Sequence, residues 1–93
     1  MKRDEMFKLV CELLRDSPEV KDVEITFETN PFIELGKDSH DGIVFACLLS
    51  ERLGIEVGPE LNPLVDDQQH RARLVGEVVD WCIERLQTKE KEK

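Results

Sequence analysis

The sequence has few aromatic residues and few of the residues that break helices. It contains four Phe, one Trp and no Tyr, with five Gly and four Pro among 93 residues. A chain of this length accommodates one core and buries about 60 to 65% of its unfolded surface. We therefore expect a single domain over residues 1–87, without a deep enclosed active site.

The sequence has only three cysteines, and their spacing excludes two common uses. Cys11, Cys47 and Cys82 are odd in number, widely separated and without a Cys-x-x-Cys pair. They indicate neither a disulfide framework nor a zinc site, so we expect reduced thiols.

Long hydrophobic runs are missing as well. No stretch approaches the ~20 apolar residues of a membrane span, and the charged residues 2–5 lead straight into an amphipathic pattern. We expect no membrane span, no signal sequence and a cytoplasmic location.

Basic residues are outnumbered, with 13 Lys and Arg against 21 Asp and Glu and a net charge of -8. This charge repels nucleic acid and favours protein surfaces with basic patches. We expect protein partners, no nucleic acid and a monomer. Composition alone equally allows the charge to serve only solubility.

Apolar residues recur at helical spacing in three segments, which predicts main helices at about 4–16, 39–53 and 73–86. Gly54 ends the second helix, and a short helical turn is expected around 61–65. The charged residues 88–93 predict a flexible C-terminal tail.

The long first loop contains a pattern that is typical of a strand. Val23, Ile25 and Phe27 alternate with polar residues, but the sequence offers this segment no partner strand. We interpret it as an extended loop across a helical core. The predicted fold class is all-α, a small four-helix bundle with three main helices and one short helix.

The helix predicted over 39–53 is apolar around more of its circumference than a small bundle can cover. At 100° per residue its apolar side chains form two groups. One group contains Phe45, Leu49 and Leu53, and the other, beside Ser39, contains Ile43 and Cys47. This predicts an exposed apolar patch suited to docking, unless the loop over 22–35 covers that side.

The start of this helix resembles the signature of acyl carrier proteins. Residues 34–41 read ELGKDSHD, an apolar helix follows, and residues 53–57 read LGIEV. The family's usual pattern is Leu-Gly-x-Asp-Ser-Leu-Asp. The resemblance extends to the first helix, the first loop and the last helix, so it covers nearly the whole chain.

The resemblance implies an acyl-carrier-like bundle and a specific modification. A phosphopantetheinyl transferase would attach 4'-phosphopantetheine from coenzyme A to Ser39, and the thiol of this arm would hold an acyl group as a thioester. Asp38 would help to present Ser39. The amides and the positive dipole end of a helix N-terminus suit a phosphodiester, although Asp38 and Ser39 could simply cap the helix.

The resemblance further implies that acyl-loading and acyl-using enzymes with basic patches bind this helix. His40 stands where the family usually has leucine, and Val44 and Ser50 stand where many carriers have acids. A specialised fatty-acid, lipid or secondary-metabolite pathway is therefore expected. The residues expected to bind partners are His40, Asp41, Ile43, Val44, Cys47, Glu51 and Glu56.

The carried group is expected to be sheltered by the parting of an apolar seam. The residues expected to line this seam are Phe45, Leu49, Val78, Val79 and Ile83. The length and identity of the carried group stay open. Two alternatives also stay open: a carrier of aminoacyl or polyketide intermediates, and an unmodified interaction module.

Residues 38–41 contain the residue types of a hydrolase triad, but successive helical residues point about 100° apart and cannot pass a proton along a line. The same divergence argues against Asp38, His40 and Asp41 as metal ligands, and His70 has no fixed relation to them. We expect neither catalytic residues nor a metal, and hence not an enzyme.

Overall fold

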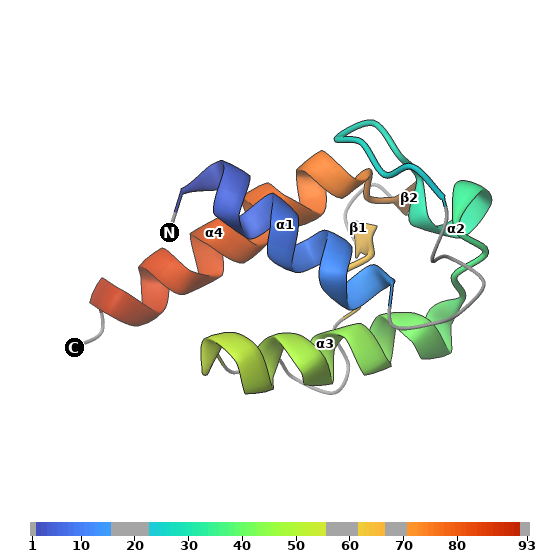
Figure 1. Cartoon of the computed structure of the whole chain (residues 1–93). Coiled ribbons are helices and arrows are strands. Elements are labelled where there is room, and N and C mark those ends of the chain that lie inside the picture. The colour runs from blue at the N-terminus through green and yellow to red at the C-terminus, as the bar shows by residue number, and fades with distance from the viewer. Residues whose placement is uncertain (1, 16–22, 56–61, 67–70, 92–93) are drawn as a thin grey trace.

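The computed structural model describes residues 2–15, 23–55, 62–66 and 71–91, with only the backbone described for Ser39, Glu90 and Lys91. In chain order the elements are α1 (Arg3–Leu14), α2 (Pro31–Glu34), α3 (Ser39–Leu53), β1 (Val65–Asp66), β2 (Arg71–Ala72) and α4 (Val75–Lys91). Figure 1 shows their arrangement.

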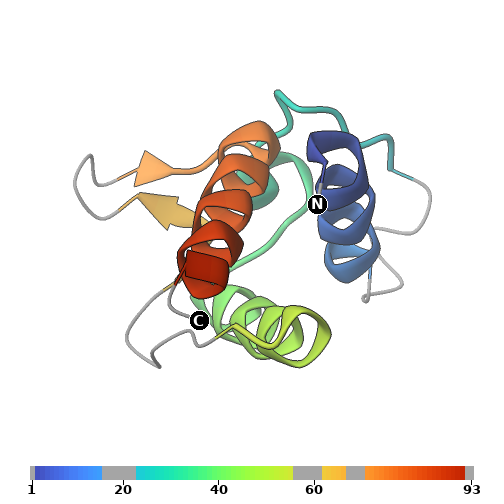
Figure 2. The same cartoon turned by 90° about the vertical axis from the view of Figure 1, so that its left-hand side faces the viewer.

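Three long helices enclose the core. Viewed nearly end-on in Figure 2, α1, α3 and α4 occupy the corners of a triangle. The apolar stripe of α1 lies against α4, and both helices contribute fully buried residues to one hydrophobic cluster. The largest completely buried side chains of the two helices are Met6, Val10, Leu14, Val75, Val78, Val79 and Cys82.

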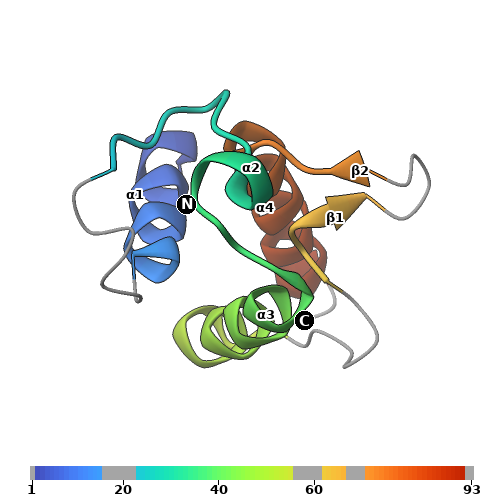
Figure 3. The ribbon, with the colours of Figure 1, turned by 90° about the vertical axis from the view of Figure 1, so that its right-hand side faces the viewer.

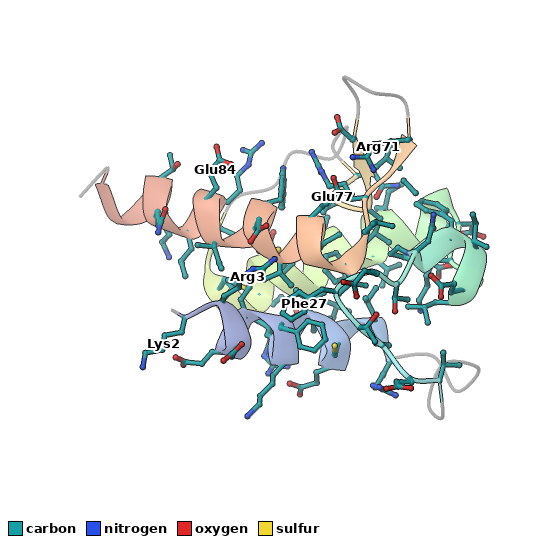
Figure 4. All side chains as sticks on the ribbon, turned by 90° about the horizontal axis from the view of Figure 1, so that it is seen from above. Lys2, Arg3, Phe27, Arg71, Glu77 and Glu84 are labelled. Carbon is teal, nitrogen blue, oxygen red and sulfur yellow. The ribbon has the colours of Figure 1, made fainter. Side chains whose placement is uncertain are left out.

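The described residues 23–30 of the first loop lie across this core without forming a strand, as predicted. Phe27 stacks on Phe7 of α1 with ring centroids 4.3 Å apart, and the Arg3 guanidinium lies 4.4 Å from the Phe27 centroid. Figure 4 shows Arg3 beside Phe27. Arg3 also pairs with Asp80 of α4 at 3.0 Å, so the loop is held where α1 meets α4.

The loop backbone also completes the start of α4. The first amides of a helix lack intrahelical acceptors. Here the amide of Val75 donates to the carbonyl of Thr29 at 2.9 Å, and that of Gly76 donates to the carbonyl of Phe27 at 2.8 Å. These two hydrogen bonds attach the backbone of the loop to the start of α4.

The short helix lies in a different place from the one predicted. It is α2, within the first loop, where the Asn30 side chain accepts from the amides of Phe32 and Ile33 and Pro31 occupies the first turn. Figure 3 shows α2 and the segment after it at one end of the three long helices.

No helix forms in the described part of the segment that was expected to hold it. Instead, β1 and β2 pair antiparallel, with Val65 opposite Ala72 and Asp66 opposite Arg71. The Asn62 side chain accepts from the amide of Leu64, and the ion pair from Arg71 to Glu77 at 2.6 Å joins this ladder to α4 (Figure 4). The expectation of an all-α fold is thus corrected to a mostly helical fold with one two-residue ladder.

The bounds of α3 agree with the prediction, while those of the other two main helices differ. α3 ends at Leu53, and Gly54 caps it with φ 64°. α1 ends at Leu14, and α4 continues past the predicted boundary through Thr88 to Lys91. The Lys89 ammonium donates to the carbonyl of Leu53 at 3.3 Å, a tertiary contact that favours the longer helix.

Gly42 makes the approach of residue 62 to α3 possible, and we expect a Gly42→Ala variant to be destabilised. An added Cβ would overlap the Asn62 amide, which would have to abandon its bond to Leu64. The expected loss is about 1–2 kcal/mol by chemical denaturation.

A double-mutant cycle separates this clash from other effects of the methyl group. In an Asn62→Ala background the Gly42→Ala change should stabilise the protein by about 0.5–1 kcal/mol, because alanine favours helices over glycine. If Gly42→Ala lowered the stability equally in the wild-type and Asn62→Ala backgrounds, the clash with Asn62 would be contradicted.

Candidate functional site

Ser39 is the first residue of α3, and the preceding residues fix this start. Asp38 is the N-cap: its Oδ1 accepts from the amide of Asp41 at 3.0 Å, while the Asp38 amide donates to Oδ2 of Asp41 at 2.9 Å. Gly36 adopts φ 65° in the turn before the cap, a conformation that glycine accepts without strain. The motif residues therefore form the junction between loop and helix.

The Asp38 carboxylate is stabilised in its charged form. The amide of Asp41 that donates to it lowers its pKa most, and the Asp41 side chain, the amide of His40 and the nearby His40 imidazole lower it further, against a smaller opposing effect of desolvation. The structure thus gives Asp38 a defined role as the cap that holds the backbone of Ser39 at the helix start.

The outer face of α3 is exposed where the sequence predicted an apolar patch. Ile43 is 47% exposed and Val44 38%, and Cys47 is exposed as well. The alternative that the first loop covers this side is therefore wrong for Ile43 and Cys47.

The polar residues expected to bind partners are divided in their exposure. His40 and Glu51 are exposed, Asp41 is half-buried and shares the cap with Asp38, and Glu56 lies outside the described residues. His40, Ile43, Val44, Cys47 and Glu51 therefore form an accessible surface along α3, which we call the outer face.

The residues of the predicted seam belong to one core cluster. Phe45 is 2% exposed, and Leu49, Val78 and Val79 are fully buried. Ile83 is partly buried and packs against the same cluster. The structure thus brings the five together in the hydrophobic core.

A small pocket of about 50 Å³ lies between α1 and α3. Its lining residues are Leu13, Leu14, Lys37, Asp41, Val44, Phe45 and Leu48. Only Phe45 was among the residues predicted to shelter a cargo. The sequence shows that Leu13 and Leu14 end one apolar stripe and that Leu48 lies on another helix, but it does not show that these stripes leave a space between them.

The described residues contain no group of three or more His, Cys, Asp or Glu side chains placed to hold a metal ion. Likewise, none of the described helices has the length and apolar character that a bilayer span requires. Comparisons with family models, with curated proteins and with solved structures found no match for this chain.

The assignment of Cys47 to the outer face predicts its chemical reactivity. In native protein we expect a thiol reagent such as DTNB to label Cys47 first, because it is exposed. Cys82 should react only after unfolding, since burial raises the pKa of its thiol to about 12 and blocks access.

A Cys47→Ser variant should lose the fast phase of this reaction, whereas a Cys82→Ala variant should keep it. Rapid labelling of Cys82 in the native protein would contradict the burial of the core face of α4.

The cap at Asp38 predicts a specific pH dependence. Because the folded pKa is lowered, its contribution to stability is complete above the ordinary aspartate pKa of about 3.9 and is lost as the pH falls through the folded value. Asparagine also caps helices but does not titrate. The Asp38→Asn variant should therefore have a melting temperature close to that of the wild type near neutral pH. In acid its melting temperature should fall less than that of the wild type.

Asp38→Ala is the matched control, since it removes the cap at every pH and should lower the melting temperature at neutral pH too. Thermal unfolding followed by circular dichroism measures all three proteins. If the melting temperatures of the wild type and Asp38→Asn fell equally as the pH decreased, the proposed origin of the lowered Asp38 pKa would be excluded.

Proposed function

We propose that this protein is a carrier of the acyl-carrier type. A 4'-phosphopantetheine arm on Ser39 holds an acyl or related group as a thioester and moves it between enzymes. Ser39 supplies the attachment oxygen, and the rest of the domain supplies recognition and shelter. The chain itself catalyses no step in this proposal.

The observation that carries the proposal is the position of the motif. The segment from Leu35 to Ser39 spans a turn and a cap and ends on the first residue of a 15-residue helix. A phosphodiester on Ser39 would lie near the first amides of α3 and its positive dipole end. An accidental sequence match within a helix or a buried strand would lack this setting.

The arrangement of the helices supports the same proposal. Three long helices with an extended first loop across them are what the resemblance implies, and we propose that they form an acyl-carrier-like bundle. The ladder of β1 and β2 is a departure from that pattern. It occupies the connection between α3 and α4, where a specialised carrier could present a surface of its own to a partner.

The outer face of α3 combines accessible apolar side chains with a negative charge. Apolar side chains of Ile43, Val44 and Cys47 are accessible there, and Glu51 adds a negative charge to a chain of net charge -8. We propose that the phosphopantetheinyl transferase and the acyl-loading and acyl-using enzymes bind here through basic and apolar patches. His40, next to Ser39, would select partners that accept an imidazole in place of leucine.

The same exposed apolar residues also favour a second candidate function, an unmodified interaction module. In that case the outer face would bind a partner protein directly, and Ser39 would carry no arm. An exposed cluster of this kind marks binding surfaces in either case, so the modification itself decides between the two functions.

Intact-mass spectrometry after incubation with coenzyme A and a broad-specificity phosphopantetheinyl transferase tests the proposal. We expect a single phosphopantetheinyl increment on the wild-type chain. Ser39→Ala should lose the increment completely. Ser50→Ala is the matched control on the same helix, because its hydroxyl donates to the carbonyl of Ala46 and its loss should leave the modification intact.

A panel of transferases, including those of the source organism, guards against a block caused by His40. No increment with any of them, or an increment that persists in Ser39→Ala, would overturn the carrier function. Failure of the whole panel would favour the interaction module.

A further inference from the structure

The exposed large hydrophobic residues of the described chain all lie close to Ser39 in the sequence. They are Ile33, which is 82% exposed, Ile43 at 47% and Val44 at 38%. Single exposed apolar residues are common on protein surfaces, but three that flank one candidate site indicate a binding surface. Ile43 and Val44 belong to the outer face of α3. Ile33 belongs to α2 and is not among the residues that the sequence predicts to bind partners.

The two parts of this surface flank Ser39 along the chain. Ile43 follows Ser39 by one helical turn, and residues four apart share a face of a helix. Ile33 precedes Ser39 by six residues, which span at most about 22 Å. Figures 1 and 3 both show α2 at the end of the molecule where α3 begins. An interface of ordinary size covers about 800 Å² of each partner, a patch roughly 30 Å across, so one enzyme bound at Ser39 can contact both isoleucines.

The short helix α2 holds Ile33 in a fixed position. Oδ1 of Asn30 accepts from the amides of Phe32 and Ile33 at 3.0 and 3.2 Å. The amide of Lys37 donates to the carbonyl of Pro31 at 3.0 Å, and Pro31 is buried. The backbone at Ile33 is thus ordered before any partner binds, so binding loses less conformational entropy there.

The charges around this surface are mainly negative. Residues 33–44 contain three carboxylates and one basic side chain other than histidine, that of Lys37. Two of the acids, Glu34 and Asp38, are exposed, whereas Lys37 is half-buried. A partner surface with an apolar centre and Lys or Arg side chains at its border complements this arrangement.

We propose that Ile33 is a second apolar anchor for the enzyme that attaches the phosphopantetheine arm to Ser39. This enzyme contacts both sides of the junction between loop and helix, with Ile33 of α2 in one apolar depression and Ile43 of α3 in another. Basic side chains of the enzyme border both depressions. The inference rests on the proposed modification of Ser39 and adds α2 to the outer face as a recognition element.

The test measures kcat and KM for modification of the whole chain at saturating coenzyme A, with the transferase of the panel that is fastest on the wild type. Each transfer forms the bond from the Ser39 oxygen to phosphorus and breaks the pyrophosphate bond of coenzyme A. It releases adenosine 3',5'-bisphosphate and the serine proton. Ile33→Ala should raise KM about fivefold to thirtyfold. It should leave kcat nearly unchanged, because Ile33 contacts the enzyme equally before and during the reaction.

Matched variants show whether the isoleucine side chain itself is responsible. Ile33→Leu should keep KM within about twofold of the wild-type value, because it preserves the apolar volume. Gln87→Ala truncates an exposed side chain of α4 near the opposite end of the molecule and should leave KM unchanged (Figure 1). Ile33→Ala should keep the wild-type melting temperature, since the side chain is 82% exposed and the backbone bond to Asn30 survives the truncation.

The outcomes separate this inference from the proposed function. No modification of the wild type by any transferase overturns both. Modification of Ile33→Ala with the wild-type KM overturns only the anchor. A fall in kcat without a rise in KM also overturns it, since that result indicates a displaced Ser39. A concentration-dependent dimer of the wild type that Ile33→Ala abolishes in sedimentation would assign Ile33 to a contact between two copies, and would overturn the anchor as well.

Discussion

The reciprocal hydrogen bonds between Asp38 and Asp41 fix the residue at which α3 begins, and the candidate site depends on that choice. Without this cap the helix could begin one residue earlier or later, and Ser39 would no longer be its first residue. With Asp38 as the cap, Phe45 and Leu49 enter the core while Ile43 and Cys47 face outward. The cap therefore sets where α3 begins, and the burial of Phe45 and Leu49 decides which side of the helix stays accessible.

The first loop contributes more than the covering of a hydrophobic face. Its carbonyls at Phe27 and Thr29 accept from the first amides of α4, and Phe27 stacks on Phe7 of α1. Loop, α1 and α4 are thereby coupled, whereas α3 is joined to α1 at its exposed edge by the ion pair from Arg52 to Glu12 at 3.2 Å. Exposed pairs of this kind contribute little to stability, so buried apolar contacts hold α3 in place.

Features with a local cause could be predicted from the sequence, and those with a distant cause could not. The bounds of α3 were predicted because the cap at Asp38 and the glycine at Gly54 adjoin the helix that they delimit. The ladder of β1 and β2 was missed because two-residue strands carry no periodicity, and α4 extends past its predicted end through the contact of Lys89 with Leu53.

The same distinction holds for the candidate site, where the sequence predicts some features and not others. Exposure of Ile43 and Cys47 follows from helical geometry and was predicted. The pocket was not, since it arises where the ends of Leu13 and Leu14 fail to meet Val44 and Leu48, and such a mismatch depends on the packing of two helices. The sequence does contain a signal for the short helix α2. Asn30, Pro31 and Glu34 are favourable residues for a cap and a first turn.

Energetics set a lower limit on the length of a carried group that could open the seam. Parting the seam would expose side chains such as Leu49 and Val79, which have no exposed surface now. Exposing two of them costs about 3–6 kcal/mol, and each buried methylene of a cargo returns about 0.8 kcal/mol. Roughly four to eight methylenes would be needed before opening the seam becomes favourable, even without the entropy of ordering the chain.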